Sequence, residues 1–256
     1  MYFIVSASTD VGNVKKVNQD CMNVQLLERN GRQLVFAILC DGMGGLQKGE
    51  LAGASVVHAF RRWREEKLPL LLMAGFQDND IRQDWTGIIT ECNEKIKAYG
   101  RRNGFSLGTT ATILLLTQGR YYVANVGDSR AYEIQGQVTQ ITRDQSVVAR
   151  EIEMGHLSPE QAETDPRRSM LLQCIGASEE VYADFYFGTP REDVVYMLCS
   201  DGFRHKLSAG EMQALLGPCV MGSAEAMQQN ERAAIQLVKE RGERDNITVV
   251  TIRTYG

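Results

Sequence analysis

Ile38-Leu-Cys-Asp-Gly-Met-Gly-Gly45 joins an apolar run to an aspartate and a glycine-rich turn, and the predicted fold is built outward from this stretch. The run from Leu34 to Cys40 has no polar break, which is typical of a strand covered on both faces. Asp41 is therefore expected at the mouth of a core strand. The glycines after it permit positive φ and close backbone approach, so a carbonyl as well as a carboxylate can face a bound ion. Taken alone, an Asp-Gly pair more often marks a turn.

The composition is that of an ordinary globular protein: of 256 residues, 43% are hydrophobic and 23% are charged. A formal net charge of −4 does not favour nucleic acid or anionic membranes as partners. The segment Met1–Val5 lacks the basic start of a signal peptide, and the apolar run 68–76 is too short to span a bilayer. Since repeats and Pro- or Ser-rich linkers are also lacking, we expect one domain, residues 1–256, and a cytoplasmic location.

The six cysteines are scattered without a C-x-x-C pair, which favours buried reduced thiols over zinc or dithiol chemistry. A cysteine phosphatase needs an arginine six positions after its thiolate, and Arg204 follows Cys199 one place too early. The three histidines leave little for an imidazole site. Any metal is therefore expected to be held by oxygen.

Hydrophobic periodicity predicts mostly antiparallel strands with a few helices. Expected strands are 2–8, 21–27, 33–40, 110–116, 121–126, 130–134, 138–141, 194–199 and 247–252. Four helices are expected: one that begins at Gly49, a second around 89–100, a third over 208–217 and a fourth over 223–241. The four strands between 110 and 141 read as one meander, which argues against a doubly wound parallel sheet. Residues 64–85 are expected to form a loop. Residues 144–192 are expected to form a functional flap with one short helix capped by Ser158.

Five aspartates stand at predicted strand ends: Asp20, Asp41, Asp128, Asp201 and Asp245. In antiparallel sheets the start of one strand lies beside the end of its neighbour, so these positions can share one rim. Grouped carboxylates repel one another unless they are protonated or neutralised by a cation, and oxygen ligands favour Mg²⁺ or Mn²⁺. Two such ions bridged by one carboxylate would activate a shared water and clamp a phosphoryl group. The pattern thus indicates a binuclear phosphohydrolase.

Six blocks resemble, in order and over nearly the whole chain, the bacterial form of the metal-dependent serine/threonine phosphatases of the PP2C (PPM) type. The blocks are Thr9-Asp-Val-Gly-Asn-Val-Lys-Lys-Val-Asn-Gln-Asp20, Cys40-Asp-Gly-Met-Gly-Gly45 with Gly49-Glu50, Gly108-Thr-Thr110, Ala124-Asn-Val-Gly-Asp-Ser-Arg-Ala-Tyr132, Cys199-Ser-Asp-Gly-Phe203 and Arg244-Asp-Asn-Ile-Thr-Val249. The resemblance implies an α+β fold, a four-layer α-β-β-α sandwich with two central antiparallel sheets flanked by helix pairs. It also implies that the flap governs substrate selectivity.

The same resemblance implies roles for the residues at the rim. They are Asp41 as the ligand bridging two Mn²⁺ or Mg²⁺ ions, the Gly42 carbonyl on one ion, Asp201 and Asp245 as terminal ligands of the other, Asp20 as a ligand through water, and Asp128 with Asp201 as the site of a weaker third ion. Gly44 and Gly45 would give backbone clearance around the metals.

Lys15 and His205 differ from the residues that the family usually has at these positions, and Met43 differs from the residue of its eukaryotic members. Lys15 stands where the family usually has an arginine that grips substrate phosphate, and lysine cannot form the bidentate fork, so weaker phosphate holding is predicted. The alternative is that Lys15 and Lys16 are solvated surface lysines. Met43 replaces the histidine of eukaryotic members, as in bacterial members, and cannot donate a proton. Leaving-group protonation would then fall to metal-bound water. His205 replaces an acidic residue and either perturbs the third-metal site or is a bystander.

The function predicted from these observations is hydrolysis of phosphoserine and phosphothreonine monoesters on proteins, without a phosphoenzyme. The partners would be phosphorylated proteins that a serine/threonine kinase encoded elsewhere modifies; we expect a monomer with no nucleic-acid or membrane partner. One alternative is a catalytically silent, phosphoprotein-binding regulatory module of the same fold. Another is a nucleotide-binding protein with residues 42–45 as a phosphate cradle, but the chain lacks the G-x-x-x-x-G-K-[ST] spacing.

Overall fold

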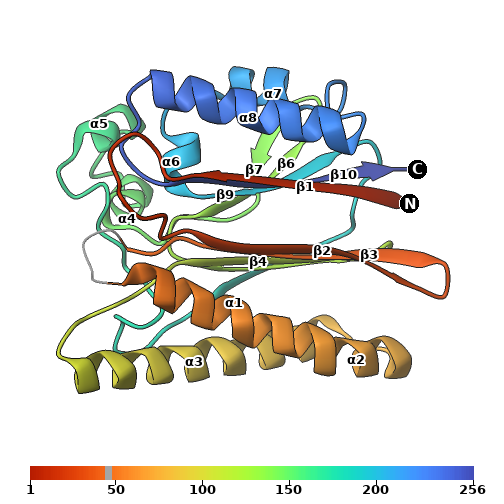
Figure 1. Cartoon of the computed structure of the whole chain (residues 1–256), viewed down its shortest axis with the longest axis horizontal. Helices are drawn as coiled ribbons and strands as arrows, with labels where there is room; N and C mark the ends of the chain where they lie inside the picture. The colour runs from red at the N-terminus through yellow and green to blue at the C-terminus, as the bar shows by residue number, and fades with distance from the viewer. Residues whose placement is uncertain (44–47) are drawn as a thin grey trace.

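The computed structural model describes residues 1–43 and 48–256. Two antiparallel sheets of five strands each lie face to face within these residues, and helices cover the outer face of each sheet (Figure 1). The predicted α+β sandwich of four layers is therefore confirmed. Gly44 and Gly45, for which clearance around metals was predicted, lie outside the described residues.

One sheet, here called the β1 sheet, has the strand order β1-β10-β9-β6-β7. Its strands are β1 (Tyr2–Asp10), β10 (Ile247–Tyr255), β9 (Val195–Cys199), β6 (Arg130–Ile134) and β7 (Val138–Gln140). The other, here called the β3 sheet, has the order β2-β3-β4-β5-β8. Its strands are β2 (Cys21–Arg29), β3 (Arg32–Cys40), β4 (Ala111–Leu116), β5 (Tyr121–Val126) and β8 (Asp184–Gly188).

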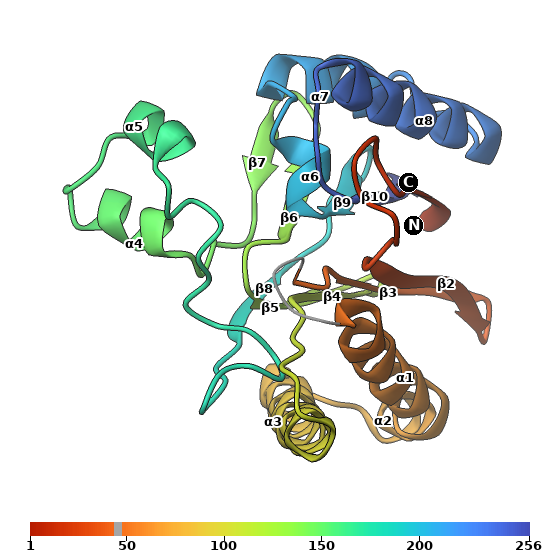
Figure 2. The same cartoon turned by 60° about the vertical axis from the view of Figure 1, so that its left-hand side comes forward.

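The helices form the two outer layers and a projection at one side. The β3 sheet is covered by α1 (Gly49–Glu66), α2 (Leu68–Ala74) and α3 (Asp78–Asn103), and the β1 sheet by α7 (Ala209–Leu216) and α8 (Ala224–Glu240). The short helix α6 (Asp201–Arg204) follows β9. Helices α4 (Val147–Glu153) and α5 (Pro159–Thr164) project away from the sandwich (Figure 2). Among the helices that the structure describes, none has the length and apolar character to cross a membrane.

Strand β3 shows why the run 34–40 carries no polar residue. Val35, Ala37 and Leu39 face the β1 sheet and belong to the core between the sheets. Phe36 and Ile38 alternate with them and face the helices, in a second core that also contains the aromatic rings of α1 and α3. Since side chains of a strand alternate between its two faces, a strand in the inner layer must be apolar on both.

The predicted loop at residues 64–85 was wrong, because α1 continues to Glu66, α2 follows, and α3 starts at Asp78. Two features hid these helices. Pro69 in the first turn of α2 is compatible with a helix start but suggests a break. The cap of α3 is a capping box made by Gln77 and Asp80 rather than by the usual Ser or Thr with Glu or Gln.

The predicted single meander was also wrong, because β4 and β5 belong to the β3 sheet whereas β6 and β7 belong to the β1 sheet. The chain changes sheets at Gly127, which has φ 98° and lies so close to Thr110 that a Cβ would be 2.6 Å from its Cγ2. Within the predicted flap, 144–192, the helix capped by Ser158 is present, and α4 had not been foreseen. The segment 184–188 forms β8, an edge strand paired with β5, so this part of the predicted flap belongs to the sheet.

Candidate metal centre

The ends of several strands meet at one rim of the sandwich. Cys21 is paired with Cys40 across β2 and β3, so Asp20 and Asp41 stand side by side just beyond the ladder. In the β1 sheet, Cys199 is paired with both Val249 and Arg130, so the residues that follow β9 and precede β10 and β6 come together. The charges of Asp20, Asp128, Asp201 and Asp245 all act on Asp41. The five predicted aspartates are thus brought together, with Asp41 among the other four.

The main chain of Asp41 is fixed by the threonine pair of the third block. Its N–H donates to Thr110 Oγ1 at 2.9 Å, and its carbonyl accepts from Thr110 N at 2.9 Å and from Thr109 Oγ1 at 3.0 Å. Thr110 Oγ1 also lies 2.9 Å from Ser129 Oγ, next to Asp128. These bonds link the loops that carry two of the aspartates, so the backbone positions of the two are coupled.

Gly42 is required for close packing and not for an unusual backbone angle. Its φ is not among the positive values in the described chain, so the predicted use of positive φ was wrong for this residue. A Cβ here would lie 2.7 Å from Gln19 O and 2.7 Å from Gly49 C. The absence of a side chain therefore lets the loop before β2, the end of β3 and the start of α1 converge.

Asp20 is held on one oxygen and open on the other. Its Oδ2 accepts from Thr248 Oγ1 at 2.6 Å, whereas its buried Oδ1 has no hydrogen-bond partner among the described residues. A buried carboxylate oxygen without a donor is costly, and a cation is a natural partner for it.

Lys15 lies at the acidic rim, where its partner is a carboxylate. Its Nζ lies 3.0 Å from Asp245 Oδ1. The loop that carries Lys15 is fixed by Asn246, whose Nδ2 donates to the carbonyls of Val11 and Val17 at 2.9 and 3.1 Å. Neighbouring Lys16 is exposed. The two lysines therefore differ: Lys15 belongs to the acidic site and Lys16 belongs to the surface.

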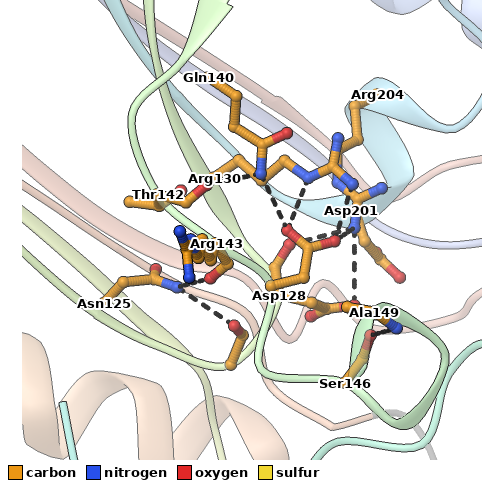
Figure 3. A network of polar contacts seen from close by, with 12 residues as sticks. Asn125, Asp128, Arg130, Gln140, Thr142, Arg143, Ser146, Ala149, Asp201 and Arg204 are labelled. Carbon is orange, nitrogen blue, oxygen red and sulfur yellow. Dashed lines mark hydrogen bonds and ion pairs between the residues drawn. The ribbon is translucent and has the colours of Figure 1, made fainter. Parts of the chain in front are cut away.

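Asp128 and Asp201 lie near a further basic group, Arg204 of α6, which points toward Asp128 in Figure 3. Arg204 Nη2 lies 3.7 Å from Asp128 Oδ2 and donates to the Asp128 carbonyl at 3.1 Å. His205 Nε2 lies 3.8 Å from Asp201 Oδ2, and its Nδ1 lies 3.7 Å from Glu243 Oε2. His205 therefore contacts Asp201, which the resemblance places at the third-metal site, and a second acid. Its role, disturbance of that site or bystander, stays a prediction.

Three of the rim carboxylates, Asp20, Asp41 and Asp128, have raised pKa values. Burial, together with repulsion from Asp201 and Asp245, raises the pKa of Asp20 to about 7. Burial and the four neighbouring carboxylates raise the pKa of Asp41 well above its usual range. Burial and repulsion from Asp201 raise the pKa of Asp128 to about 7, although Arg204 acts in the opposite direction. The rim thus holds several acids that resist ionisation together, which is the condition that a bound cation relieves.

The carboxylates of Asp20 and Asp41 fit a hard divalent cation. Two observations support this: the buried Oδ1 of Asp20 has no hydrogen-bond partner among the described residues, and the two carboxylates repel each other. In the described part of the chain, no three His, Cys, Asp or Glu side chains already form a group that could hold a metal ion. The fit is different at Asp128, because Arg204 already provides a positive charge there.

Two charged residues beside the predicted aspartates, Arg204 and Asp144, were not predicted from the sequence as part of the site. Arg204 follows Asp201 by three positions in α6 and so shares its helical face, a signal that was available. Asp144 accepts a bidentate pair of bonds from Arg130 at 2.7 and 2.7 Å and lies 3.3 Å from Arg204. Nothing in the local pattern around Asp144 marks it, because its charged partners, Arg130 and Arg204, lie 14 and 60 positions away in the sequence.

Comparison with known proteins gives consistent matches over nearly the full chain. A family model described as Protein phosphatase 2C matches residues 13–239. The chain is 28% identical over 251 residues to protein phosphatase PhpP of Streptococcus pneumoniae, covering 97% of this chain and 96% of that relative. It is 30% identical over 250 residues to serine/threonine phosphatase stp of Listeria innocua, covering 95% of this chain and 93% of that relative.

Solved structures agree with these sequence matches. Serine/threonine phosphatase Stp1 from Staphylococcus aureus superposes with a TM-score of 0.85 at 27% identity, covering 100% of this chain and 96% of that one. The catalytic domain of the serine/threonine protein phosphatase PstP, solved in complex with two manganese ions, gives a TM-score of 0.78 at 25% identity and covers 99% of each chain.

Proposed function

The chain belongs to the protein phosphatase 2C family and is a protein phosphatase, and from this premise we propose that it hydrolyses phosphoserine and phosphothreonine monoesters on proteins with divalent cations held at the acidic rim. One observation carries the proposal. Asp20 and Asp41 lie together with three further carboxylates, and a buried oxygen of Asp20 has no partner in the described chain. The related PstP domain was solved with two manganese ions, which supports two Mn²⁺ or Mg²⁺ ions here.

For the ligands we propose the roles that the family resemblance implies, and the grouping of the five aspartates at the rim supports them. The proposed set is Asp41 as the bridging ligand, Gly42 through its carbonyl, Asp201 and Asp245 as terminal ligands, and Asp20 through water. Bound divalent cations supply the acidity that turns a water molecule into a nucleophile at neutral pH, and they neutralise charge on a phosphoryl group. Asp128 does not belong to this set, because it is paired with Arg204.

The residues around the cations position the substrate and limit the available acids. Lys15, 3.0 Å from Asp245, is the proposed phosphate-holding residue, and as a point charge it holds phosphate less rigidly than an arginine fork. Met43 donates its backbone N–H to the Gly108 carbonyl at 3.1 Å, and its thioether has no proton to give a leaving group. The side chain at position 43 therefore takes no part in acid catalysis.

The substrates would be phosphorylated proteins, and a serine/threonine kinase encoded elsewhere would supply them. We expect a monomer. The silent phosphoprotein-binding module is less well supported, because a module that only binds phosphate has no need for five mutually repelling carboxylates at one rim.

Hydrolysis of a phosphothreonine peptide with Mn²⁺, and with excess chelator, tests the proposal. We expect turnover with Mn²⁺, none with chelator, and a loss of at least about a thousandfold in Asp41→Asn, since one bridging ligand serves both ions. Glu28→Gln, which removes an exposed charge on β2, is the matched control and should retain activity. Turnover that survived the chelator or persisted in Asp41→Asn would refute the proposal. Binding of the peptide without turnover in the presence of Mn²⁺ would favour the silent module.

A further inference from the structure

Arg204 is a buried cation inside the acidic rim. Its side chain is 11% exposed, and its Nη2 contacts the Asp128 carbonyl at 3.1 Å, the Asp128 carboxylate at 3.7 Å and the Asp144 carboxylate at 3.3 Å. The side chain of Asp128 is itself 10% exposed. The ion pair is therefore largely shielded from water. In such a shielded position the attraction between two charges is stronger than at the protein surface.

A second arginine fixes this arrangement. Arg130 grips Asp144 through two bonds of 2.7 Å, and Gln140 Nε2 also donates to Asp144 Oδ1 at 3.3 Å. Arg204 thus sits between a carboxylate of the rim and a carboxylate that is held from the other side. These four groups are two carboxylates and two guanidinium groups, so their charges balance among themselves, whereas Asp201 belongs to the proposed ligands of the two ions.

The identity of the cation matters because guanidinium cannot lose its proton in a protein. Its charge is permanent, and its position is set by α6, the helix that begins with Asp201. A divalent ion at Asp128 would have to approach within about 2–2.5 Å of the carboxylate while a fixed positive group lies beside it. Repulsion between the two cations opposes that approach.

We propose that Arg204 takes the place of a third metal ion at Asp128, so that this protein carries a built-in guanidinium where the family resemblance implies an exchangeable ion. The inference rests on the proposed function for the two remaining ions. It makes Arg204 a positioning residue: it neutralises Asp128 and joins it to Asp144, the residue that leads into the helices of the flap.

The inference is tested by measuring how many Mn²⁺ ions each protein molecule binds. Calorimetry gives this number directly, and the electron paramagnetic resonance signal of the free ion gives it by difference. Asp128→Asn should bind the same number of ions as the wild-type protein. Arg204→Gln should bind one more, because the carboxylate loses its internal cation, and adding Asp128→Asn to Arg204→Gln should remove the extra ion. Arg204→Lys keeps the charge and should bind the wild-type number. Arg241→Gln, which breaks an exposed ion pair with Glu211, is the control for the loss of an arginine.

Two results would overturn the inference: one ion fewer in Asp128→Asn than in the wild type, or the same number in Arg204→Gln as in the wild type. The first result does not require Arg204→Gln to fold. Failure of the proposed function is separately visible, because the wild-type protein would then bind no Mn²⁺ at the rim. In that case an ion gained by Arg204→Gln would still support the inference, and no gain would still refute it.

Discussion

Asp20 should make the metal-free protein less stable as the pH rises. Burial, with repulsion from Asp201 and Asp245, raises its pKa from 3.8 to about 7 in the folded state. The folded protein then binds the proton more tightly than the unfolded chain, so protonated Asp20 stabilises the fold fully below about pH 4, and this contribution is lost as the pH rises through 7. Between about pH 5 and pH 8 the loss amounts to about 2.5 kcal/mol of unfolding free energy.

The perturbation that isolates this effect is Asp20→Asn, measured by urea unfolding with chelator at about pH 5, 6, 7 and 8. Buried Trp63 and Trp85 report unfolding by fluorescence. The amide cannot titrate, so the variant should lose about 2.5 kcal/mol less than the wild type over this pH range. The NH₂ group of the asparagine would face the position where Asp20 Oδ1 has no partner. This lowers the unfolding free energy of the variant by about 1–3 kcal/mol at every pH, so it does not alter the predicted difference in pH dependence.

Parallel pH profiles of wild type and Asp20→Asn would refute the reasoning, because they would show that Asp20 ionises without penalty. Glu28→Gln serves as the control, since it removes an exposed acid and should keep the wild-type profile. Saturating Mn²⁺ should reverse the wild-type slope, because ligands must be deprotonated to bind a metal.

Three further predictions concern the residues around the rim. Lys15→Met should raise KM for a phosphopeptide about tenfold and change kcat less, in steady-state kinetics, because one charged contact to phosphate is lost; an unchanged KM would contradict this role. Gly202→Ala should destabilise by about 2–4 kcal/mol in urea unfolding, because its Cβ would lie 2.1 Å from Asn246 O. Gly210→Ala, with no described atom within 4 Å of the new Cβ, is its control and should not destabilise. Asn246→Ala should destabilise by about 2–3 kcal/mol and speed hydrogen exchange in residues 11–19, since two loop carbonyls lose their donor; unchanged exchange would argue against that anchor.

Elements with strong local signals were predictable from the sequence. The hairpin between β2 and β3 has Asn30 at φ 51° and Gly31 at φ 70°, as an Asn-Gly turn requires. Ser208 and Glu211 form the predicted capping box of α7. The assignment of β6 to the other sheet was not predictable, because the sheet that a hairpin joins depends on packing between segments far apart in sequence. Helix α2 was missed because its sequence, Leu68–Ala74, is apolar at almost every position and has Pro69 in the first turn, so no helical periodicity marks it.

The candidate site shows the same division. The five aspartates were found because each stands at a strand end, and antiparallel topology brings strand ends to a common rim. The partners of these aspartates were harder to find. Arg204 meets Asp128 across 76 positions of sequence, and Lys15 meets Asp245 across an even longer separation. Spacing along the chain carries no information about such contacts, although the position of Arg204 one helical turn after Asp201 indicated the direction of its side chain.

The place of β10 in its sheet has a consequence for synthesis of the protein. This last strand lies between β1 and β9, and in the described chain β1 has β10 as its ladder partner. A ribosome-bound chain therefore holds β1 unpaired until β10 has been synthesised. Asp20 meanwhile lacks its bond from Thr248, and Asp245 has no fixed position beside Asp41. We expect nascent chains that lack β10 to be inactive, so that phosphatase activity begins only after this strand has been made.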